Sequence, residues 1–199
     1  MANKGIEKFE AGAYYHIVNH AVGIENLFRS EDNYRYFLSR YAAYMPSVCS
    51  TLCYCLMPNH IHFLILVHSE EILLRHKKYK GDIHKLVMQQ WSNLLNSYAK
   101  AYNKKYKRKG ALWLDYTKRF KVANDSYLTA AIHYIHNNPI KHGFTKKLED
   151  WPYTSYCSIT SDKPTSLARE EVINWFGSKA DYIKFHKTTV THIIEEQEI

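Results

Sequence analysis

Two histidines one residue apart are the side chains of this chain best suited to chemistry. His60 and His62 stand at the start of the apolar run in the segment MPNHIHFLILV. In a strand, residues two apart project from the same face, so the two imidazoles would lie side by side. Two neutral imidazoles at that spacing supply half of a divalent-metal site. On its own the pair is better explained as ordinary strand-end histidines, because the chain has twelve histidines.

A second pair of polar side chains would complete such a site. Tyr134 and Asn138 are four residues apart in the segment DSYLTAAIHYIHNNP, so in a helix they share one face. The amide oxygen of Asn138 suits a third metal ligand, and the hydroxyl of Tyr134 suits a metal-assisted attack on phosphorus. Tyr134 falls beside the apolar stripe of this helix, so by spacing alone it could equally be a core residue. Surface or packing roles are expected for the other histidines nearby, which are His133, His136 and His142.

Hydrophobic periodicity predicts the elements that must position these side chains. In chain order we expect a strand at 13–22, a helix at 30–45, a hairpin of strands at 50–58 and 60–68, a helix from Asp82 to about Asn103, a strand at 118–123 and a helix from 125 to about Asn138. Ser30 and Asp82 are the expected N-caps of the first two helices, and Asp125 or Ser126 of the third. Pro139 disfavours helical geometry at the preceding residue, which places the end of the third helix there. This order favours an α+β sandwich with helices packed on a mainly antiparallel sheet.

Composition limits the class of protein. The 199 residues are 46% hydrophobic and 23% charged, as in ordinary globular proteins. No window approaches the roughly 18 uninterrupted apolar residues of a membrane span, and the first residues, MANKGIEKFEAG, lack the apolar core of a secretory signal, so we expect a cytoplasmic protein with no membrane partner. The four cysteines have no zinc-site spacing, and Cys53 and Cys55 are expected to be small buried hydrophobes.

Positive charge is concentrated in one segment. Residues 71–121 hold fourteen Lys and Arg and three Asp and Glu, a net charge of +11 against −3 for the remainder of a chain whose total is +8. Such a localised excess favours a polyanionic partner. Several of the seventeen tyrosines are interleaved with these lysines, as in NKKYKRKGALW, and could stack on unpaired bases. The alternative is a solvated charged face with scattered core aromatics.

Taken together, the motifs of the chain resemble the single-tyrosine HUH transposases, and within them most closely the REP-associated tyrosine transposases. The resemblance runs from about residue 14 to 156. It is carried by YYHIVNHAVGIENLFRSEDNYRYFL, CLMPNHIHFLILV, GALWLDYTKRF, YLTAAIHYIHNNPIKHGF and WPYTSY. Asn138 stands where the insertion-sequence branch carries glutamine and the REP-associated branch usually carries asparagine.

The resemblance implies a ferredoxin-like fold and a mechanism. His60, His62 and Asn138 match the metal ligands, for Mg²⁺ or Mn²⁺, and Tyr134 matches the nucleophile. The implied activity is cleavage and rejoining of single-stranded DNA at hairpins through a 5′-phosphotyrosine intermediate. The enzyme would be a monomer or a homodimer with exchanged tyrosine helices. We expect the catalytic domain over residues 1–160 and a C-terminal helical extension over 161–199.

The basic segment would then contact the DNA hairpin. The expected contacts to phosphates and bases are Lys104, Lys105, Lys107, Arg108, Lys109, Lys118, Arg119, Lys121, Tyr106 and Trp113. Two alternatives stay open. A hairpin-binding protein for DNA or RNA on the same fold, with little or no cleavage, would keep the basic surface. A metal-dependent hydrolase of small phosphoesters would use His60 and His62 but would need no basic surface.

Overall fold

The fold is built on a four-stranded antiparallel sheet in the order β2-β3-β1-β4. The computed structural model describes residues 6–122 and 124–188. The strands are β1 (Tyr14–His20), β2 (Cys49–Leu56), β3 (His60–Val67) and β4 (Lys118–Lys121). The hairpin of β2 and β3 lies where the Pro58–Asn59 turn predicted it, and β1 crosses to the middle of the sheet beside β3.

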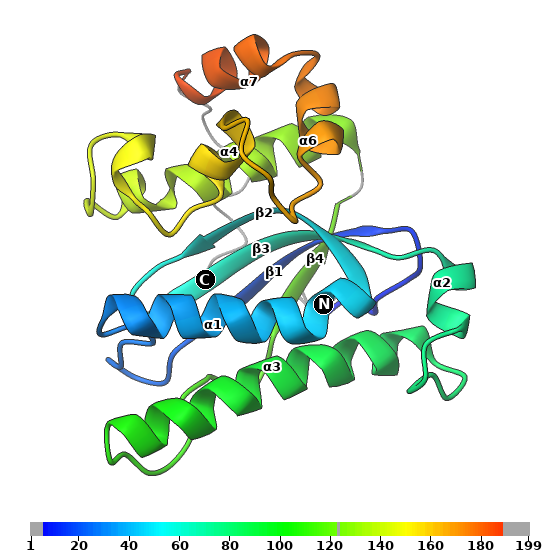
Figure 1. The fold of residues 1–199 in the computed structure, drawn as a ribbon, viewed down its shortest axis with the longest axis vertical. Coiled ribbons are helices and arrows are strands. Elements are labelled where there is room, and N and C mark those ends of the chain that lie inside the picture. Colours follow the sequence, from blue (N-terminus) through cyan, green and yellow to red (C-terminus); the bar gives the residue numbers. More distant parts are fainter. Residues whose placement is uncertain (1–5, 123, 189–199) are drawn as a thin grey trace, which may run out of the picture.

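Helices cover both faces of the sheet (Figure 1). The helices α1 (Glu31–Tyr44) and α3 (Ile83–Lys105) pack on one face, and α4 (Asp125–Lys141) packs on the other. The shorter helices are α2 (Glu70–Leu74), α5 (Tyr156–Thr160), α6 (Arg169–Phe176) and α7 (Lys179–His186), and single 3₁₀ turns lie at Met45–Ser47 and Leu148–Asp150. The predicted α+β class and its antiparallel, ferredoxin-like sheet are confirmed. No helix within the described residues is long and apolar enough to cross a membrane.

Successive residues of β3 alternate between the two faces of the sheet. Ile61 and Phe63 are fully buried in the core shared with α1 and α3, whereas Leu64 is buried in the core shared with α4. His60 and His62 share the face of Leu64, because residues two apart in a strand point the same way. The two histidines therefore project toward the helix that carries Tyr134.

The capping residues explain where the helices begin. The Asp82 carboxylate accepts a hydrogen bond from the Lys85 N–H at 2.9 Å, as expected of the N-cap of α3. Ser30 is the N-cap of α1, although its hydroxyl makes no capping hydrogen bond. The N-cap of α4 is Asn124, which lies just before the predicted candidates, and its side chain accepts from the Tyr127 N–H.

The prediction that α4 ends near Asn138 is wrong, because the helix continues through Pro139 to Lys141. Proline removes one backbone donor, but the next donors are satisfied. His142 N–H donates to the Asn138 carbonyl at 2.9 Å, and Phe144 N–H donates to the Pro139 carbonyl at 2.8 Å. These bonds outweigh the preference for extended backbone before proline. Asn138 is thereby held inside a regular helix.

Two cysteines lie in the hydrophobic core, and the C-terminal segment is helical. Cys53 and Cys55 are free and fully buried in the core beneath α4, which confirms their expected role. The helix α6 ends at Gly177, whose φ of +89° suits glycine. The boundary predicted near residue 160 stays a prediction, and residues 189–199 of the predicted extension lie outside the described residues.

A buried hydrogen-bond network fixes α7 to α4, the helix that carries Tyr134. His186 Nδ1 donates to the Tyr182 carbonyl at 2.9 Å, so its Nε2 accepts from His136 Nδ1 at 3.0 Å. His136 Nε2 then accepts from the Ser155 hydroxyl at 2.7 Å. The network requires neutral imidazoles, and burial lowers the pKa of His186 to about 4. His136 therefore has the packing role that the sequence predicted for it.

The pKa of His186 predicts a stability that falls with acid. The unfolded chain takes up this proton near pH 6.5, whereas the folded chain resists it down to about pH 4. The contribution is therefore complete above pH 6.5 and is lost as the pH falls, by up to about 1.4 kcal/mol per pH unit. Urea unfolding at pH 7, 6 and 5 should show stability falling with acid, and His186→Gln should make that fall shallower by up to about 1.4 kcal/mol per pH unit, because other buried histidines keep the remainder of the slope. Tyr182→Phe should instead lower stability by the same amount at each pH; an unchanged slope in His186→Gln would contradict the assignment.

Candidate functional site

The two histidines of β3 are buried at the interface between the sheet and α4. His60 is 5% exposed and His62 is fully buried. Their ring centroids are 5.0 Å apart and the rings are nearly perpendicular. Burial, with a smaller effect of the neighbouring histidines, lowers the pKa of His60 to about 3 and holds that of His62 well below its usual range. Both imidazoles are therefore neutral at physiological pH, as metal ligands must be.

Outer partners hold the Nδ1 atoms of both histidines. His60 Nδ1 lies 2.8 Å from Asn59 Oδ1, an amide oxygen that can only accept, so the ring proton is on Nδ1 and the lone pair is on Nε2. His62 Nδ1 lies 2.9 Å from Nε2 of His16, a buried residue of β1. Such second partners are typical of metal-binding histidines, because they fix the ring and its tautomer.

Asn138 brings an amide oxygen to the lone pair of His60. Asn138 is fully buried, and its Nδ2 donates to the Tyr134 carbonyl at 3.2 Å, which turns Oδ1 toward the sheet. Asn138 Oδ1 lies 3.4 Å from His60 Nε2, and with the His60 proton on Nδ1 both atoms are acceptors. Two ligands about 2.1 Å from one cation lie roughly 3.0–3.4 Å apart for angles of about 90–110°. The separation and the donor types therefore fit a divalent cation.

The described residues hold no group of three His, Cys, Asp or Glu side chains that could bind a metal. The predicted set differs from such a group, since it consists of two imidazoles and one amide oxygen.

Tyr134 packs its ring against the same histidines. Its centroid lies 5.8 Å from that of His62 and 6.1 Å from that of His16, with both pairs edge to face. The Tyr134 hydroxyl is buried and has no hydrogen-bond partner among the described residues. The Lys141 ammonium, one helical turn beyond Asn138, lies 5.1 Å from the ring centroid. The four side chains predicted for the site are thus brought together within one chain.

Two further histidines surround His60. His20 of β1 stacks on it with centroids 5.0 Å apart, and His142 lies 5.3 Å away, just beyond α4. His16, His20 and Asn59 were not predicted as part of the site. For His16 and His20 the sequence does carry a signal: they are four residues apart in the strand YYHIVNH, so they share one face of the sheet, and this strand pairs with β3.

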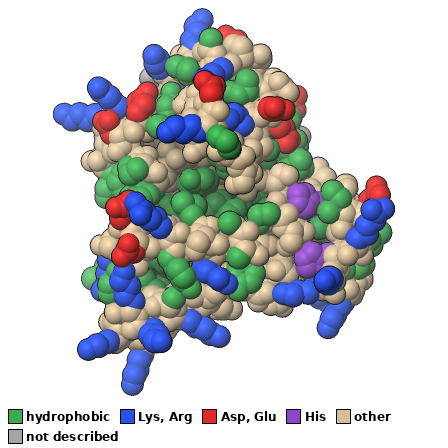
Figure 2. Space-filling model, in the orientation of Figure 1, with side chains coloured by type: hydrophobic (Ala, Val, Ile, Leu, Met, Phe, Trp, Pro, Cys, Tyr) green, Lys and Arg blue, Asp and Glu red, His purple; other side chains and the backbone are tan. Residues whose placement is uncertain are grey.

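The densest part of the basic segment, residues 104–109, lies at the end of α3 and in the loop after it. Lys104, Lys105, Lys107 and Lys109 are exposed to solvent. Figure 2 shows Lys and Arg side chains gathered along the lower edge of the molecule, the side on which α3 lies in Figure 1. Lys118 is half-buried, and Lys121 pairs with Glu10 at 2.6 Å. The exposed lysines are the cations best placed to meet a polyanion.

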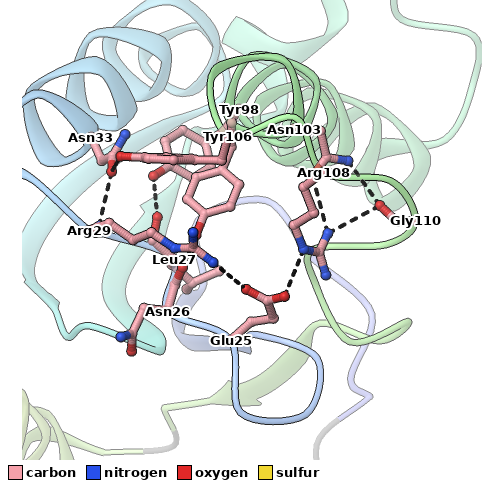
Figure 3. Close-up of polar contacts among 11 residues, drawn as sticks. Glu25, Asn26, Leu27, Arg29, Asn33, Tyr98, Asn103, Tyr106, Arg108 and Gly110 are labelled. Carbon is pink, nitrogen blue, oxygen red and sulfur yellow. Dashed lines mark hydrogen bonds and ion pairs between the residues drawn. The ribbon is translucent and has the colours of Figure 1, made fainter.

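Arg108 and Tyr106 instead tie the end of α3 to the loop after β1 (Figure 3). The Glu25 carboxylate accepts from Arg108 Nε at 2.8 Å and from Arg29 Nη2 at 3.0 Å. The Tyr106 hydroxyl donates to Asn33 Oδ1 at 2.7 Å, and the Arg29 guanidinium lies 4.9 Å from the Tyr106 ring centroid. These side chains hold the loop that leads from His20 to α1.

Two of the predicted DNA contacts are not supported by their positions. Arg119 is 5% exposed, and its guanidinium donates to the carbonyls of Glu7 and Thr117. Trp113 is 8% exposed, and its indole N–H donates to the Leu95 carbonyl at 3.1 Å. Both side chains are engaged inside the protein, so phosphate binding and base stacking need other residues.

Comparisons with known proteins agree with the resemblance found in the sequence. No family model matches the chain. A Haemophilus influenzae protein inferred to be a REP-associated tyrosine transposase is 29% identical over 109 residues, which are 53% of this chain and 58% of that relative. The chain thus matches little more than half of the relative's length. The resemblance to REP-associated tyrosine transposases is confirmed.

A solved structure shares the fold. A REP-associated tyrosine transposase bound to a REP hairpin has a TM-score of 0.61 and 15% identity to this chain, over 84% of this chain and 92% of that one. The antiparallel sheet with helices packed on it is therefore a fold that the two proteins share.

Proposed function

We propose that this chain is a transposase of the REP-associated tyrosine type, which cleaves and rejoins single-stranded DNA at hairpins. The observation that carries the proposal is the meeting of His60 Nε2 and Asn138 Oδ1 at 3.4 Å, in a site where the Tyr134 ring packs against His62. The names of the relative and of the neighbouring structure support the same class of activity and substrate.

Tyr134 is the proposed nucleophile. Its oxygen attacks the scissile phosphorus, the bond from phosphorus to the 3′ oxygen breaks, and a 5′-phosphotyrosine and a free 3′-OH result. An ordinary tyrosine has a pKa near ~10 and is a weak nucleophile at neutral pH. A divalent ion, Mg²⁺ or Mn²⁺, would supply charge neutralisation and orientation of the phosphate when held by His60, His62 and Asn138. The covalent bond conserves the phosphodiester energy, so rejoining needs no nucleotide cofactor.

The four proposed site residues come from one chain. Tyr134 and Asn138 come from α4, which packs against β3 of the same chain, so no exchanged helix is required. This supports a monomer over a dimer with swapped tyrosine helices.

The exposed lysines after α3 are proposed to bind the phosphates of the hairpin. Each phosphate contact contributes about −0.7 to the slope of log K against log salt on single strands and about −0.9 on duplex. The double variant Lys107→Gln/Lys109→Gln should therefore weaken hairpin binding and make that slope shallower by roughly 1.4–1.8. Fluorescence anisotropy at several salt concentrations measures both quantities. Lys179→Gln, a lysine of α7 paired with Asp162, is the matched control and should leave the slope unchanged.

The deciding experiment uses labelled single-stranded hairpins from the DNA that flanks the gene of this chain. The full chain is incubated with each hairpin and Mn²⁺, and the products are separated on a denaturing gel. A labelled band at the mass of protein plus DNA supports the transposase. Tight hairpin binding without any such band would favour a hairpin-binding protein on the same fold. Free cleavage products without a covalent band would favour a hydrolase.

A further inference from the structure

His16 occupies a position that the proposed reaction does not itself explain. It lies on β1 opposite Leu64, two residue pairs from the pair that holds His62, on the face of the sheet that meets α4. Its side chain is 1% exposed, and its ring lies among His62, Phe120 and Tyr134 at centroid distances of 5.2, 6.1 and 6.1 Å. Burial of a polar ring costs free energy unless its nitrogens are hydrogen-bonded, so the partners of His16 decide how it is accommodated.

The hydrogen bond of His16 links its tautomer to that of His62. His16 Nε2 and His62 Nδ1 are 2.9 Å apart, so one of the two nitrogens donates and the other accepts. If His62 donates, its proton is on Nδ1 and its Nε2 carries the lone pair that a metal needs. If His16 donates, His62 must carry its proton on Nε2, which cannot then bind a cation.

Asn59 fixes His60 in the metal-binding tautomer, with the proton on Nδ1 and the lone pair on Nε2. The Asn59 amide oxygen can only accept, so it always holds the His60 proton on Nδ1. The metal-binding form of the site thus requires two acceptors behind the two histidines, an amide oxygen behind His60 and an imidazole nitrogen behind His62.

We propose that His16 is a positioning residue that accepts the Nδ1 proton of His62 and so directs His62 Nε2 to the divalent cation. The inference rests on the proposed function, because it assumes that His62 is a ligand. In this form the His16 proton is on its own Nδ1, which is buried without a hydrogen-bond partner among the described residues. Burial of that N–H without a partner costs free energy. Cation binding at His62 Nε2 offsets this cost, because only the tautomer with the His62 proton on Nδ1 can bind a cation.

The test measures Mn²⁺ binding to the full chain without DNA, through the electron paramagnetic resonance signal of free Mn²⁺. His16→Leu keeps apolar bulk but removes the acceptor, and it should raise the dissociation constant about 10–100-fold, as loss of an outer partner does. His16→Gln can place its amide oxygen near the position of Nε2 and should stay within about threefold of wild type. His16→Asn is too short to do so and should resemble His16→Leu. Near-UV circular dichroism checks that each variant is folded.

The ranking of Gln above Asn separates positioning from packing. Asn is one methylene shorter than Gln and leaves a larger gap beside Phe120 and Tyr134, so the stability of the two variants is compared as well. A purely structural role would lower Mn²⁺ affinity only in step with stability, whereas positioning lowers the affinity of a variant that is still folded. If His16→Leu does not fold, the comparison of His16→Gln with His16→Asn still tests whether His16 acts as a positioning residue. Equal affinities of the Gln and Asn variants, or wild-type affinity in His16→Leu, would overturn the inference while leaving the metal site in place.

A spectroscopic measurement and a control complete the design. In the Zn²⁺-loaded chain, long-range ¹H–¹⁵N correlation spectra should show the proton of His62 on Nδ1; a proton on Nε2 would overturn the inference. His62→Ala should lose Mn²⁺ binding altogether. If wild type binds no Mn²⁺ and His62→Ala changes nothing, the proposed metal site fails and the role of His16 fails with it.

Discussion

Tyr134→Phe is expected to abolish the covalent protein–DNA product while leaving hairpin binding within about twofold of wild type. The substitution removes only the oxygen that would bond to phosphorus, so adduct formation should fall by about 10³-fold or more, as when a covalent nucleophile is deleted. Binding should survive because the hydroxyl makes no hydrogen bond within the described residues and the phenyl ring can keep its edge-to-face contacts with His16 and His62. Denaturing gels measure the adduct, and fluorescence anisotropy measures the binding.

Tyr127→Phe is the matched control for this experiment. Tyr127 lies two turns earlier on α4, on the same side of the helix, and both tyrosines pack against Ala130 and Ala131. The control should keep wild-type adduct formation. Persistence of the adduct in Tyr134→Phe would assign the nucleophile to another of the seventeen tyrosines.

Local pattern was sufficient for most of the fold. The alternation in HIHFLILV predicts a strand with both histidines on one face, and the apolar spacing of Leu128, Ala131, Ile132 and Ile135 predicts the buried side of α4; all four residues are buried. The end of α4 was not predictable in the same way. The bonds that carry the helix past Pro139 involve residues beyond it, and a local preference cannot register them.

The neighbours of the site residues could be predicted only with the strand order of the sheet. His16 meets His62 because β1 crosses to lie beside β3, which is a contact between residues 46 positions apart. Arg119 counts as one more cation in the sequence, yet its strand turns it inward to two carbonyl groups. Charge along the chain predicts a basic surface, whereas only tertiary packing decides which cations reach solvent.

Loss of a proposed histidine ligand should be as severe as loss of the proposed nucleophile. His60→Ala removes one of the two imidazoles and leaves Asn138 Oδ1 without the lone pair that faces it at 3.4 Å. Adduct formation should fall by about 10³-fold, because charge neutralisation and orientation of the phosphate are lost together. A chelator should have the same effect on wild type, with recovery when Mn²⁺ is added. Excess Mn²⁺ should not restore His60→Ala.

His142→Ala is the control that tests the ligand set. His142 lies 5.3 Å from His60 between ring centroids and follows the same helix as Asn138, so it shares the surroundings of the site. The hydrogen bond from Asn138 Nδ2 to the Tyr134 carbonyl turns Asn138 Oδ1 to within 3.4 Å of His60 Nε2. His142→Ala should therefore keep adduct formation within a few-fold of wild type, whereas Asn138→Ala should lower it about 10–100-fold. A loss in His142→Ala as large as that in His60→Ala would make His142 the third ligand and leave Asn138 with the task of holding the helix.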